Sequence, residues 1–157
     1  MTVKHLLAIF TTGLVLSACD TTKKGSDMNA DANAAAHGAP GSEQDFRASV
    51  NDRVLFAFDS STVSAEGRTL LDAQSEWMKK YPNAKFMIEG HCDKRGTREY
   101  NLALGARRAQ AIKEYLATKG ISESRVHTVS YGKERLEFLG DTDTDHAKNR
   151  RGVSVVQ

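Results

Sequence analysis

The order of short β-favouring runs and long helical patterns is the feature of this sequence that most limits its fold. Four runs favour β-strands and two segments show helical periodicity, in the chain order 53–58, 64–81, 85–89, 98–119, 125–131 and 153–156. The first, third, fifth and sixth of these are strands, so the order is β-α-β-α-β-β. An amphipathic helix must bury its apolar face against another element. We therefore predict an α+β sandwich, in which one mixed sheet packs with two main helices.

The two helical patterns have recognisable ends and predicted core faces. Ser64 is a residue type that caps helix N-termini, and Pro82 ends the first pattern. Gly120 is a typical stop for the second. Spacings of three and four residues predict the side chains that face the core: Leu70, Ala73, Trp77 and Tyr81 in the first helix, and Leu102, Gly105, Ala109, Ile112 and Leu116 in the second.

The first 18 residues are predicted to be a secretory signal peptide. Lys4 is followed by an apolar run from Leu6 to Leu16 that is too short to span a bilayer comfortably. A buried N-terminal helix is the alternative, but no amphipathic pattern organises the segment. Leu16-Ser17-Ala18-Cys19 resembles the bacterial lipobox, after which cleavage leaves a lipidated cysteine as the new N-terminus. We therefore expect Cys19 to be lipidated and to anchor the chain to a membrane.

Residues 19–45 are predicted to be a lipidated N-terminus followed by a flexible linker. The segment is small and polar, and Met28 is its only large aliphatic side chain. Such a composition cannot bury enough apolar surface to order itself. As a coil of this length it would average about 30 Å from end to end. The folded domain is then expected over residues 46–157.

The stretch GHCDKRGTREYN, residues 90–101, suggests either a metal site or a reactive thiol, but its spacing supports neither. His91, Cys92 and Asp93 are consecutive, so in an extended segment their side chains cannot all converge on one ion. Cys92 has no base and orienting group at a useful spacing, and a buried structural cysteine is the simpler interpretation. The acidic run at 141–145 lacks the following Gly and the closing Glu of a calcium loop, so we expect a solvated loop and no metal.

A binding site for a charged ligand is the remaining interpretation of this stretch. In a helix that continues from Thr97, one stripe carries Thr97, Asn101, Leu104 and Arg108, at steps of four, three and four. Arg108 could then share a pocket with Asp93, and Asp59 could reach the same end of the sheet. A guanidinium binds a carboxylate bidentately, and a carboxylate accepts hydrogen bonds from an ammonium group. Such a site suits a zwitterion, although an internal Asp–Arg salt bridge without a ligand is an equal alternative.

Four segments carry a resemblance to a known family. IEGHCDKRGTREYNLALGARRAQAIKEYL (88–116) is supported by FAFDSS (56–61), SRVHTVSYGKE (124–134) and AKNRRGVSV (147–155). Together they resemble the OmpA-like C-terminal domain family over the whole chain from about Val54 onward. The resemblance implies the OmpA-like form of the sandwich predicted above, and a domain that binds without catalysing.

The resemblance also implies a ligand and a set of binding residues. The ligand is meso-diaminopimelate in the peptide stems of peptidoglycan, held by Asp93 and Arg108. Phe58, Asp59, Thr97 and Leu104 match further ligand-contacting positions, and Asn101 matches a supporting position at the loop-to-helix junction.

The cellular role is likewise implied by the resemblance. It comprises a lipid anchor in the outer membrane, a domain facing the periplasm, membership of the Tol envelope system with TolB as a partner, and support of envelope integrity and cell division. No cofactor is expected, and a net charge of +2 with interspersed signs gives no sign of nucleic-acid binding. The alternative is an envelope enzyme acting on cell-wall peptides, which would need a nucleophile, metal or acid–base pair that the spacing does not supply.

Overall fold

The computed structural model describes residues 38–157, so the expected signal peptide, lipidated Cys19 and most of the linker lie outside the described residues. Four strands form one mixed sheet: β1 (Arg53–Leu55), β2 (Phe86–His91), β3 (Val126–Gly132) and β4 (Arg151–Val156). Their order in the sheet is β1-β4-β2-β3. β2 and β3 are parallel, whereas β4 runs antiparallel to both of its neighbours. The predicted α+β class and the order of the main elements are confirmed.

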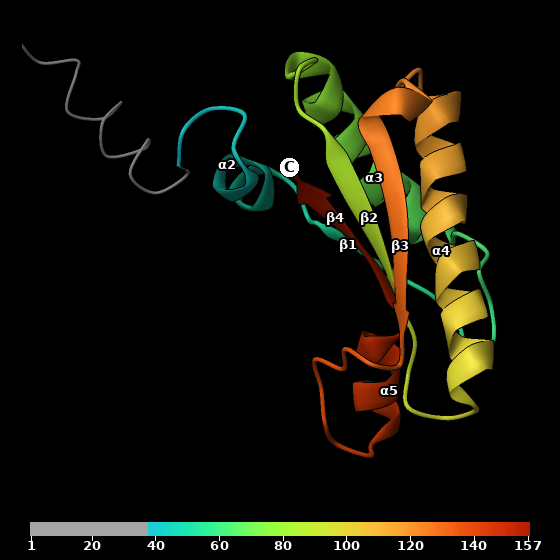
Figure 1. Ribbon diagram of the computed structural model, residues 1–157. Helices are drawn as coiled ribbons and strands as arrows, with labels where there is room; N and C mark the ends of the chain where they lie inside the picture. Colours follow the sequence, from blue (N-terminus) through green and yellow to red (C-terminus); the bar gives the residue numbers. More distant parts are fainter. Residues whose placement is uncertain (1–37) are drawn as a thin grey trace, which may run out of the picture.

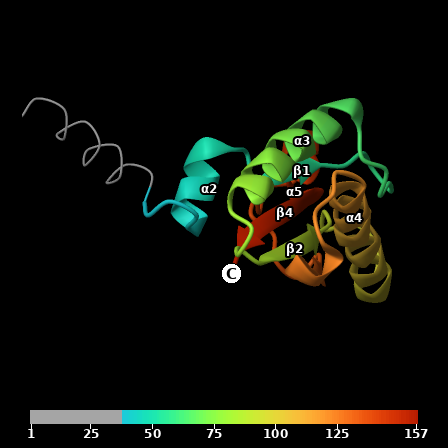
Figure 2. The same ribbon diagram turned by 90° about the horizontal axis from the view of Figure 1, so that it is seen from above.

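Two long helices, α3 (Ala65–Lys80) and α4 (Arg98–Thr118), pack on the sheet (Figures 1 and 2). The hydroxyl of Ser64 accepts a hydrogen bond from the Gly67 N–H and caps α3, as its residue type predicts. The hydrophobic core lies between these helices and the sheet. It consists of Phe46, Val54, Phe56, Leu71, Trp77, Met78, Phe86, Ile88, Ala109, Ile112, Leu116, Ile121 and Val126.

Three shorter elements were not expected from the sequence: α2, η1 and, described in the next paragraph, α5. α2 (Glu43–Ser49) places Phe46 in the core, in edge contact with the rings of Trp77 and Phe86. It lies beside the C-terminal end of β4 (Figure 1). The boundary expected between residues 45 and 46 therefore falls inside a helix. η1 (Glu123–Arg125) leads into β3.

The expected solvated loop at 141–145 is wrong, because these residues belong largely to the helix α5 (Asp143–Asn149). Thr142 and Asp145 form a reciprocal capping box, in which each side chain accepts a hydrogen bond from the backbone N–H of the other residue. Acidic residues in the first turn of α5 also suit the positive end of the helix dipole. The acidic run is thus a helix-start signal.

The buried faces of the helices differ in part from the predicted ones. Trp77 is buried as expected, but α3 turns Leu71 and Met78 inward and leaves Ala73 exposed. In α4, Gly105, Ala109, Ile112 and Leu116 face the core, whereas Leu102 is 46% exposed. The first half of α4 instead buries Asn101, Leu104 and Arg108. The hydrophobic spacing missed this because two of these three side chains are polar.

Close backbone contact between α4 and the sheet explains this arrangement. A Cβ added at Gly90 of β2 would lie 1.9 Å from the Gly105 carbonyl oxygen, and one at Gly105 would lie 2.3 Å from the Ser130 hydroxyl. Only glycine fits where two backbones approach so closely. This contact fixes the N-terminal half of α4 next to the C-terminal end of β2. None of the described helices is long and apolar enough to cross a membrane.

Candidate functional site

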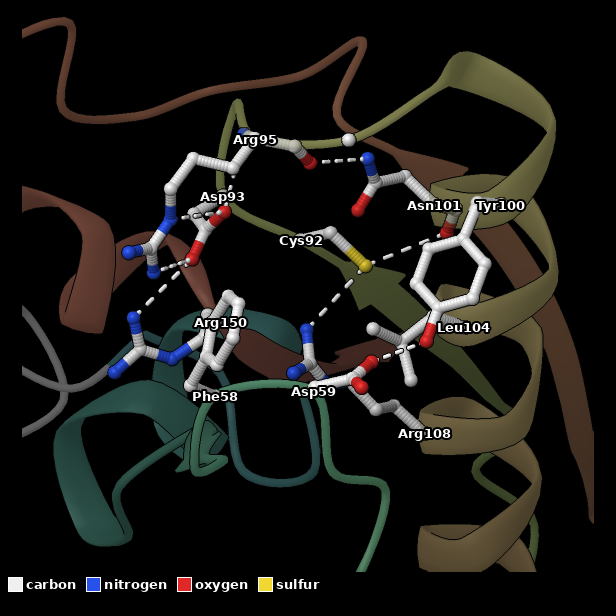
Figure 3. A pocket seen from close by; sticks show the side chains of 11 residues that line it. Phe58, Asp59, Cys92, Asp93, Arg95, Tyr100, Asn101, Leu104, Arg108 and Arg150 are labelled. Carbon is white, nitrogen blue, oxygen red and sulfur yellow. Dashed lines mark hydrogen bonds and ion pairs between the residues drawn. The ribbon is translucent and has the colours of Figure 1, made fainter.

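A small pocket opens where the loop after β2, the start of α4 and the loop after β1 come together (Figure 3). Its volume is about 90 Å³, well below the roughly 300–1,000 Å³ of pockets that enclose a whole drug-sized ligand. It can therefore hold one end of a larger molecule. The pocket is lined by Phe58, Asp59, Cys92, Asp93, Arg95, Gly96, Tyr100, Asn101, Leu104, Arg108 and Arg150.

Arg108 forms the buried wall of this pocket. Its Nε donates to the Ser60 carbonyl oxygen at 2.8 Å, and its Nη2 donates to that of Ala57 at 3.1 Å. Its Nη1 donates to the His91 carbonyl oxygen at 2.8 Å and to the Cys92 sulfur at 3.3 Å. Burial lowers the pKa of Arg108, while Cys92 and Asp93 nearby favour its charged form. Four of its five N–H groups are thus engaged, and one on Nη2 has no acceptor among the described residues.

Asp93 is the buried carboxylate of the pocket, and two other arginines bind it. Oδ1 accepts from the backbone N–H and the Nε of Arg95, and Oδ2 accepts from Arg95 Nη2 at 2.6 Å and Arg150 Nη1 at 3.2 Å. Burial by itself would raise the pKa of Asp93, but the hydrogen bonds from Arg95 and Arg150 outweigh it and lower the pKa. Within the described residues no hydrogen bond or ion pair joins Asp93 to Arg108. The internal salt bridge considered as the alternative for this pair is therefore not formed.

The outer rim of the pocket comes from the loop after β1 and from the first turn of α4. Asp59 has a left-handed backbone with φ of 54°, and its carboxylate accepts a hydrogen bond from the Tyr100 hydroxyl. This bond raises the pKa of Tyr100. Phe58 is 63% exposed, and the Arg95 guanidinium lies 4.3 Å from the centre of its ring. The rim thus combines an exposed aromatic ring with charged side chains at the mouth of the pocket.

Three further predicted residues lie in α4 or cap its start, and they take different places. Leu104 lies on the pocket lining. The Asn101 side chain donates to the carbonyl oxygens of Arg95 and Thr97, at 2.7 and 2.9 Å, and so joins the loop to the helix. Thr97 is the N-cap of α4: its hydroxyl accepts from the Tyr100 N–H at 3.2 Å, and it does not line the pocket.

Cys92 and His91 are buried at the end of β2. The Cys92 thiol donates to the Asn101 carbonyl oxygen at 3.3 Å, and burial raises its pKa. A thiol with a raised pKa and no base as partner is not an activated nucleophile. No group of three or more His, Cys, Asp or Glu side chains in the described part of the chain could hold a metal ion.

The structure thus brings Phe58, Asp59, Asp93, Asn101, Leu104 and Arg108 together and leaves Thr97 outside. Sequence reasoning missed Arg95, Tyr100 and Arg150. Arg95 and Tyr100 lie inside the stretch 90–101. Arg95 is two positions after Asp93, and this short separation could have suggested that the two side chains form an ion pair.

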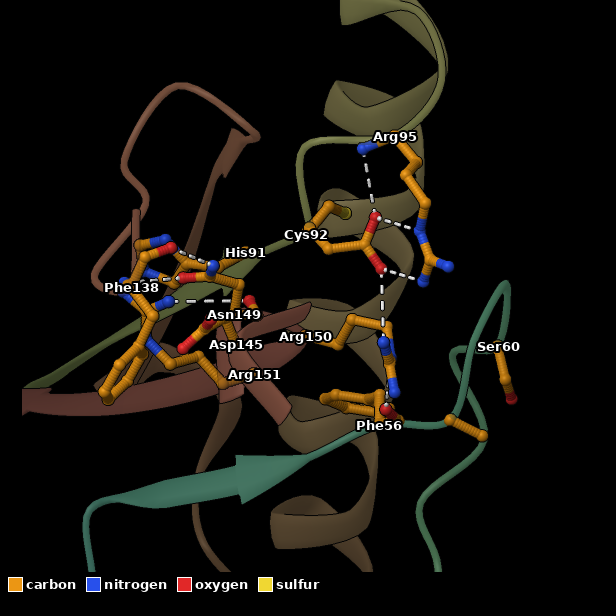
Figure 4. A network of polar contacts seen from close by, with 12 residues as sticks. Phe56, Ser60, His91, Cys92, Arg95, Phe138, Asp145, Asn149, Arg150 and Arg151 are labelled. Atoms are coloured by element: carbon orange, nitrogen blue, oxygen red, sulfur yellow. Dashed lines mark hydrogen bonds and ion pairs between the residues drawn. The ribbon is translucent and has the colours of Figure 1, made fainter. Parts of the chain in front are cut away.

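Arg150 carried no spacing signal, because 57 residues separate it from Asp93. It follows Asn149, whose side chain holds the backbone of Phe138, and its own Nε donates to the Phe56 carbonyl oxygen (Figure 4). Arg150 therefore reaches the pocket from a fixed position at the start of β4.

Comparison with known proteins agrees with this geometry. The model of the OmpA family matches residues 55–150. The peptidoglycan-associated lipoprotein of Rhizobium meliloti (strain 1021) is 50% identical over 117 residues, which are 74% of this chain and 66% of that protein. The protein of the same name from Mesorhizobium japonicum is 43% identical over 145 residues, covering 91% of this chain and 86% of its own length.

Solved structures show the same fold. The crystal structure of the peptidoglycan-associated lipoprotein from Burkholderia pseudomallei has a TM-score of 0.66 at 38% identity, and the match covers 68% of this chain and 91% of that one. The C-terminal domain of Helicobacter pylori MotB, at 18% identity and a TM-score of 0.63, shares the fold alone. The matched family model and these relatives show that the chain belongs to the OmpA family.

Proposed function

We propose that this protein is a lipid-anchored tether that binds peptidoglycan noncovalently and links the outer membrane to the cell wall. The names of its relatives support this role, because proteins 43–50% identical to it are called peptidoglycan-associated lipoproteins. The expected signal peptide and lipidated Cys19 supply the membrane end, and the linker up to residue 45 supplies reach. The domain would then face the periplasm.

The bound group is proposed to be meso-diaminopimelate in the peptide stem of peptidoglycan. One observation carries this proposal: a buried carboxylate, Asp93, and a buried guanidinium with an unused N–H, Arg108, line the same small pocket. The free end of diaminopimelate carries an ammonium and a carboxylate on one carbon, which are the two partners that these side chains recognise. The small volume fits such an end group, while the rest of the stem remains outside.

The remaining predicted residues would support this binding from three sides. Phe58 and Asp59 form the exposed entrance, Leu104 supplies an apolar lining, and Asn101 holds the loop after β2 on α4. Thr97 would act indirectly, by fixing the first turn of α4.

The protein would work within the Tol–Pal system, with TolB and other Tol components as partners, and support envelope integrity and cell division. The resemblance of the four sequence segments is the support for these partners. Sucrose-gradient fractionation of native membranes tests the anchor: the protein should sediment with outer-membrane markers, and a Cys19→Ser variant should leave the membrane fraction. An unchanged distribution of that variant would contradict lipidation at Cys19.

Sedimentation with isolated sacculi tests the ligand. The full chain should cosediment without releasing soluble muropeptides, whereas release would point to the alternative, an envelope enzyme. Asp93→Asn and Arg108→Lys should both reduce cosedimentation, because each removes one half of the proposed recognition.

The matched control for Asp93→Asn is Glu76→Gln on the exposed side of α3, which also replaces a carboxylate by an amide, but away from the pocket. Circular dichroism should accompany each variant, because both site residues are buried and either change could disturb the fold. If folded Asp93→Asn and Arg108→Lys proteins still cosediment like the wild type, the proposed site is wrong.

A further inference from the structure

Two guanidinium groups share the Asp93 carboxylate, and they are held very differently (Figures 3 and 4). The Arg150 side chain is 14% exposed and is tied by its Nε to the Phe56 carbonyl oxygen. The Arg95 side chain is 43% exposed. Its hydrogen-bonding groups reach no acceptor in the described structure except Asp93. Arg150 is therefore fixed by the fold, whereas Arg95 lies on the solvent side of Asp93 and its guanidinium is hydrogen-bonded to that carboxylate alone.

Arg95 covers the Asp93 carboxylate from the solvent side. Its Nη2 and Nε approach the two Asp93 oxygens at 2.6 and 3.3 Å, which occupies both of them. The same guanidinium rests against the exposed ring of Phe58. Phe58, Asp93 and Arg95 all line the pocket, so an incoming ammonium group meets an arginine already in its place.

Exchange of this arginine has a low cost. The exposed Arg95 guanidinium loses little when it leaves, because water can take the place of the carboxylate as its partner. Arg150 stays on Oδ2, so the carboxylate keeps its orientation when Arg95 leaves. The Phe58 ring can still receive the displaced guanidinium.

We propose that Arg95 is an internal competitor for the ligand: in the free protein it occupies the Asp93 position that the ligand's ammonium takes in the complex. This inference rests on the proposed function. A simple amine merely exchanges one cation for another at Asp93 and gains little. A zwitterion also gains the unused N–H of Arg108, so it binds more tightly than the amine against the same competition. Arg95 thus lowers the affinity of every ligand that binds at Asp93.

Calorimetry on the full chain in detergent micelles tests this competition. The probes are the tripeptide L-Ala-γ-D-Glu-meso-diaminopimelate and its counterpart with lysine in the third position, which lacks the distal carboxylate. Arg95→Gln should bind the first tripeptide up to about fivefold more tightly, the effect of removing a weak competing ion pair whose arginine is exposed. The ratio of the two affinities should not change, because competition at Asp93 opposes both probes equally. The matched control, Arg98→Gln, removes an equal charge three positions along the chain, at an arginine whose one ion pair among the described residues is with Glu134, and should bind like the wild type.

A second measurement follows Arg95 itself. In the wild type its Nε–H signal in a heteronuclear NMR spectrum should be that of a hydrogen-bonded group, and it should move to the position of a free guanidinium when the tripeptide binds. Arg95→Lys keeps the charge but loses the two-pronged contact, so its affinity should lie between those of the wild type and Arg95→Gln.

The outcomes separate this inference from the function on which it rests. If the wild type binds the tripeptide and Arg95→Gln binds it equally or more weakly, Arg95 is not a competitor. A changed ratio between the two probes would overturn it too, since Arg95 would then contact the distal carboxylate. If neither the wild type nor any variant binds, the proposed function fails and this inference fails with it.

Discussion

The inner wall and the outer rim of the pocket are built in different ways. We define the wall as Cys92, Asp93, Arg108 and Arg150, and the rim as Phe58, Asp59, Arg95 and Tyr100. The wall residues bond to backbone carbonyls of the frame or to one another: Arg108 alone ties together Ala57, Ser60 and His91. The rim residues are exposed, and their side chains contact one another or reach inward to Asp93.

This difference separates the roles of the two regions. The wall is completed by folding, so a change there should alter stability and binding together. The rim adds little to the folded state, because its contacts are open to water. A rim change should therefore alter binding alone. The predictions below test this separation, beginning with the largest expected effect.

Arg108→Ala should lower the free energy of unfolding by about 3 kcal/mol or more, because it removes a hydrogen-bond donor from three carbonyl oxygens and opens a buried cavity. Of these three oxygens, that of Ala57 keeps a second donor, the Ser60 N–H. Urea unfolding followed by circular dichroism measures this effect. The control is Arg107→Ala, at the neighbouring exposed position, which should change the stability by less than about 0.5 kcal/mol. Equal stabilities for the two variants would contradict the distinction between wall and rim, since the contacts of Arg108 would then not stabilise the folded protein.

Acid should lower the free energy of unfolding through the buried His91. Burial and the nearby Arg151 lower the pKa of His91 from 6.5 to about 4. The unfolded chain then binds a proton at a higher pH than the folded protein does. Stability from this group is complete above pH 6.5 and is lost as the pH falls towards 4, by up to about 3 kcal/mol at about 1.4 kcal/mol per unit. Urea midpoints measured between pH 7 and 4.5 should therefore decrease.

A variant assigns this pH dependence to the histidine. Among the groups that act on His91, Arg151 opposes its charge, and Glu89 and Glu137 favour it. Arg135 acts in both directions, because its backbone favours the charge and its guanidinium opposes it. His91→Gln keeps these groups and removes the titration, so its urea midpoint should change less between pH 6.5 and 4.5, whatever its stability at pH 7. An equally steep change in His91→Gln would place the acid sensitivity elsewhere.

The sequence was sufficient to predict the frame but only part of the site. The order of elements and the inward position of Gly105, Ala109, Ile112 and Leu116 followed from spacing, because burial repeats with the period of the helix. Leu102 was misplaced because the backbone of α4 lies against Gly132 there: a Cβ on that glycine would meet the Leu102 nitrogen at 2.9 Å. A close backbone approach of this kind has no periodic signal.

The partners of Asp93 show where spacing fails within the site. Arg108 lies on the helical stripe and does reach the pocket, but it bonds to carbonyl oxygens that belong to no sequence motif. Arg150 is brought to Asp93 by the pairing of β4 with β2, which a single sequence does not reveal. Arg95 lies two positions after Asp93, and this closeness makes it a candidate partner. It does not show whether an exposed loop arginine pairs with the carboxylate or points into solvent.

Thr97→Ala should lower the free energy of unfolding by about 1 kcal/mol, the usual effect of losing a helix N-cap. Thr97→Ser should restore it, because serine keeps the oxygen that accepts from the Tyr100 N–H. Sacculus binding should fall only as far as the first turn of α4 frays. If Thr97→Ala abolished binding without loss of stability, Thr97 would be a direct ligand contact and would join the rim.

Phe58→Ala is the smallest change to the folded protein and the sharpest test of the comparison. The side chain is 63% exposed, and its removal should alter the free energy of unfolding by less than about 0.5 kcal/mol. Sacculus binding should nevertheless weaken, because the ring forms the entrance to the pocket beside Arg95. Leu139→Ala removes another exposed apolar side chain, 79% exposed and outside the pocket lining, and should leave both properties unchanged. Both changes remove an exposed apolar side chain, and only Phe58 lies at the pocket. A loss of binding confined to Phe58→Ala would therefore show that the rim acts on the ligand and not on the fold.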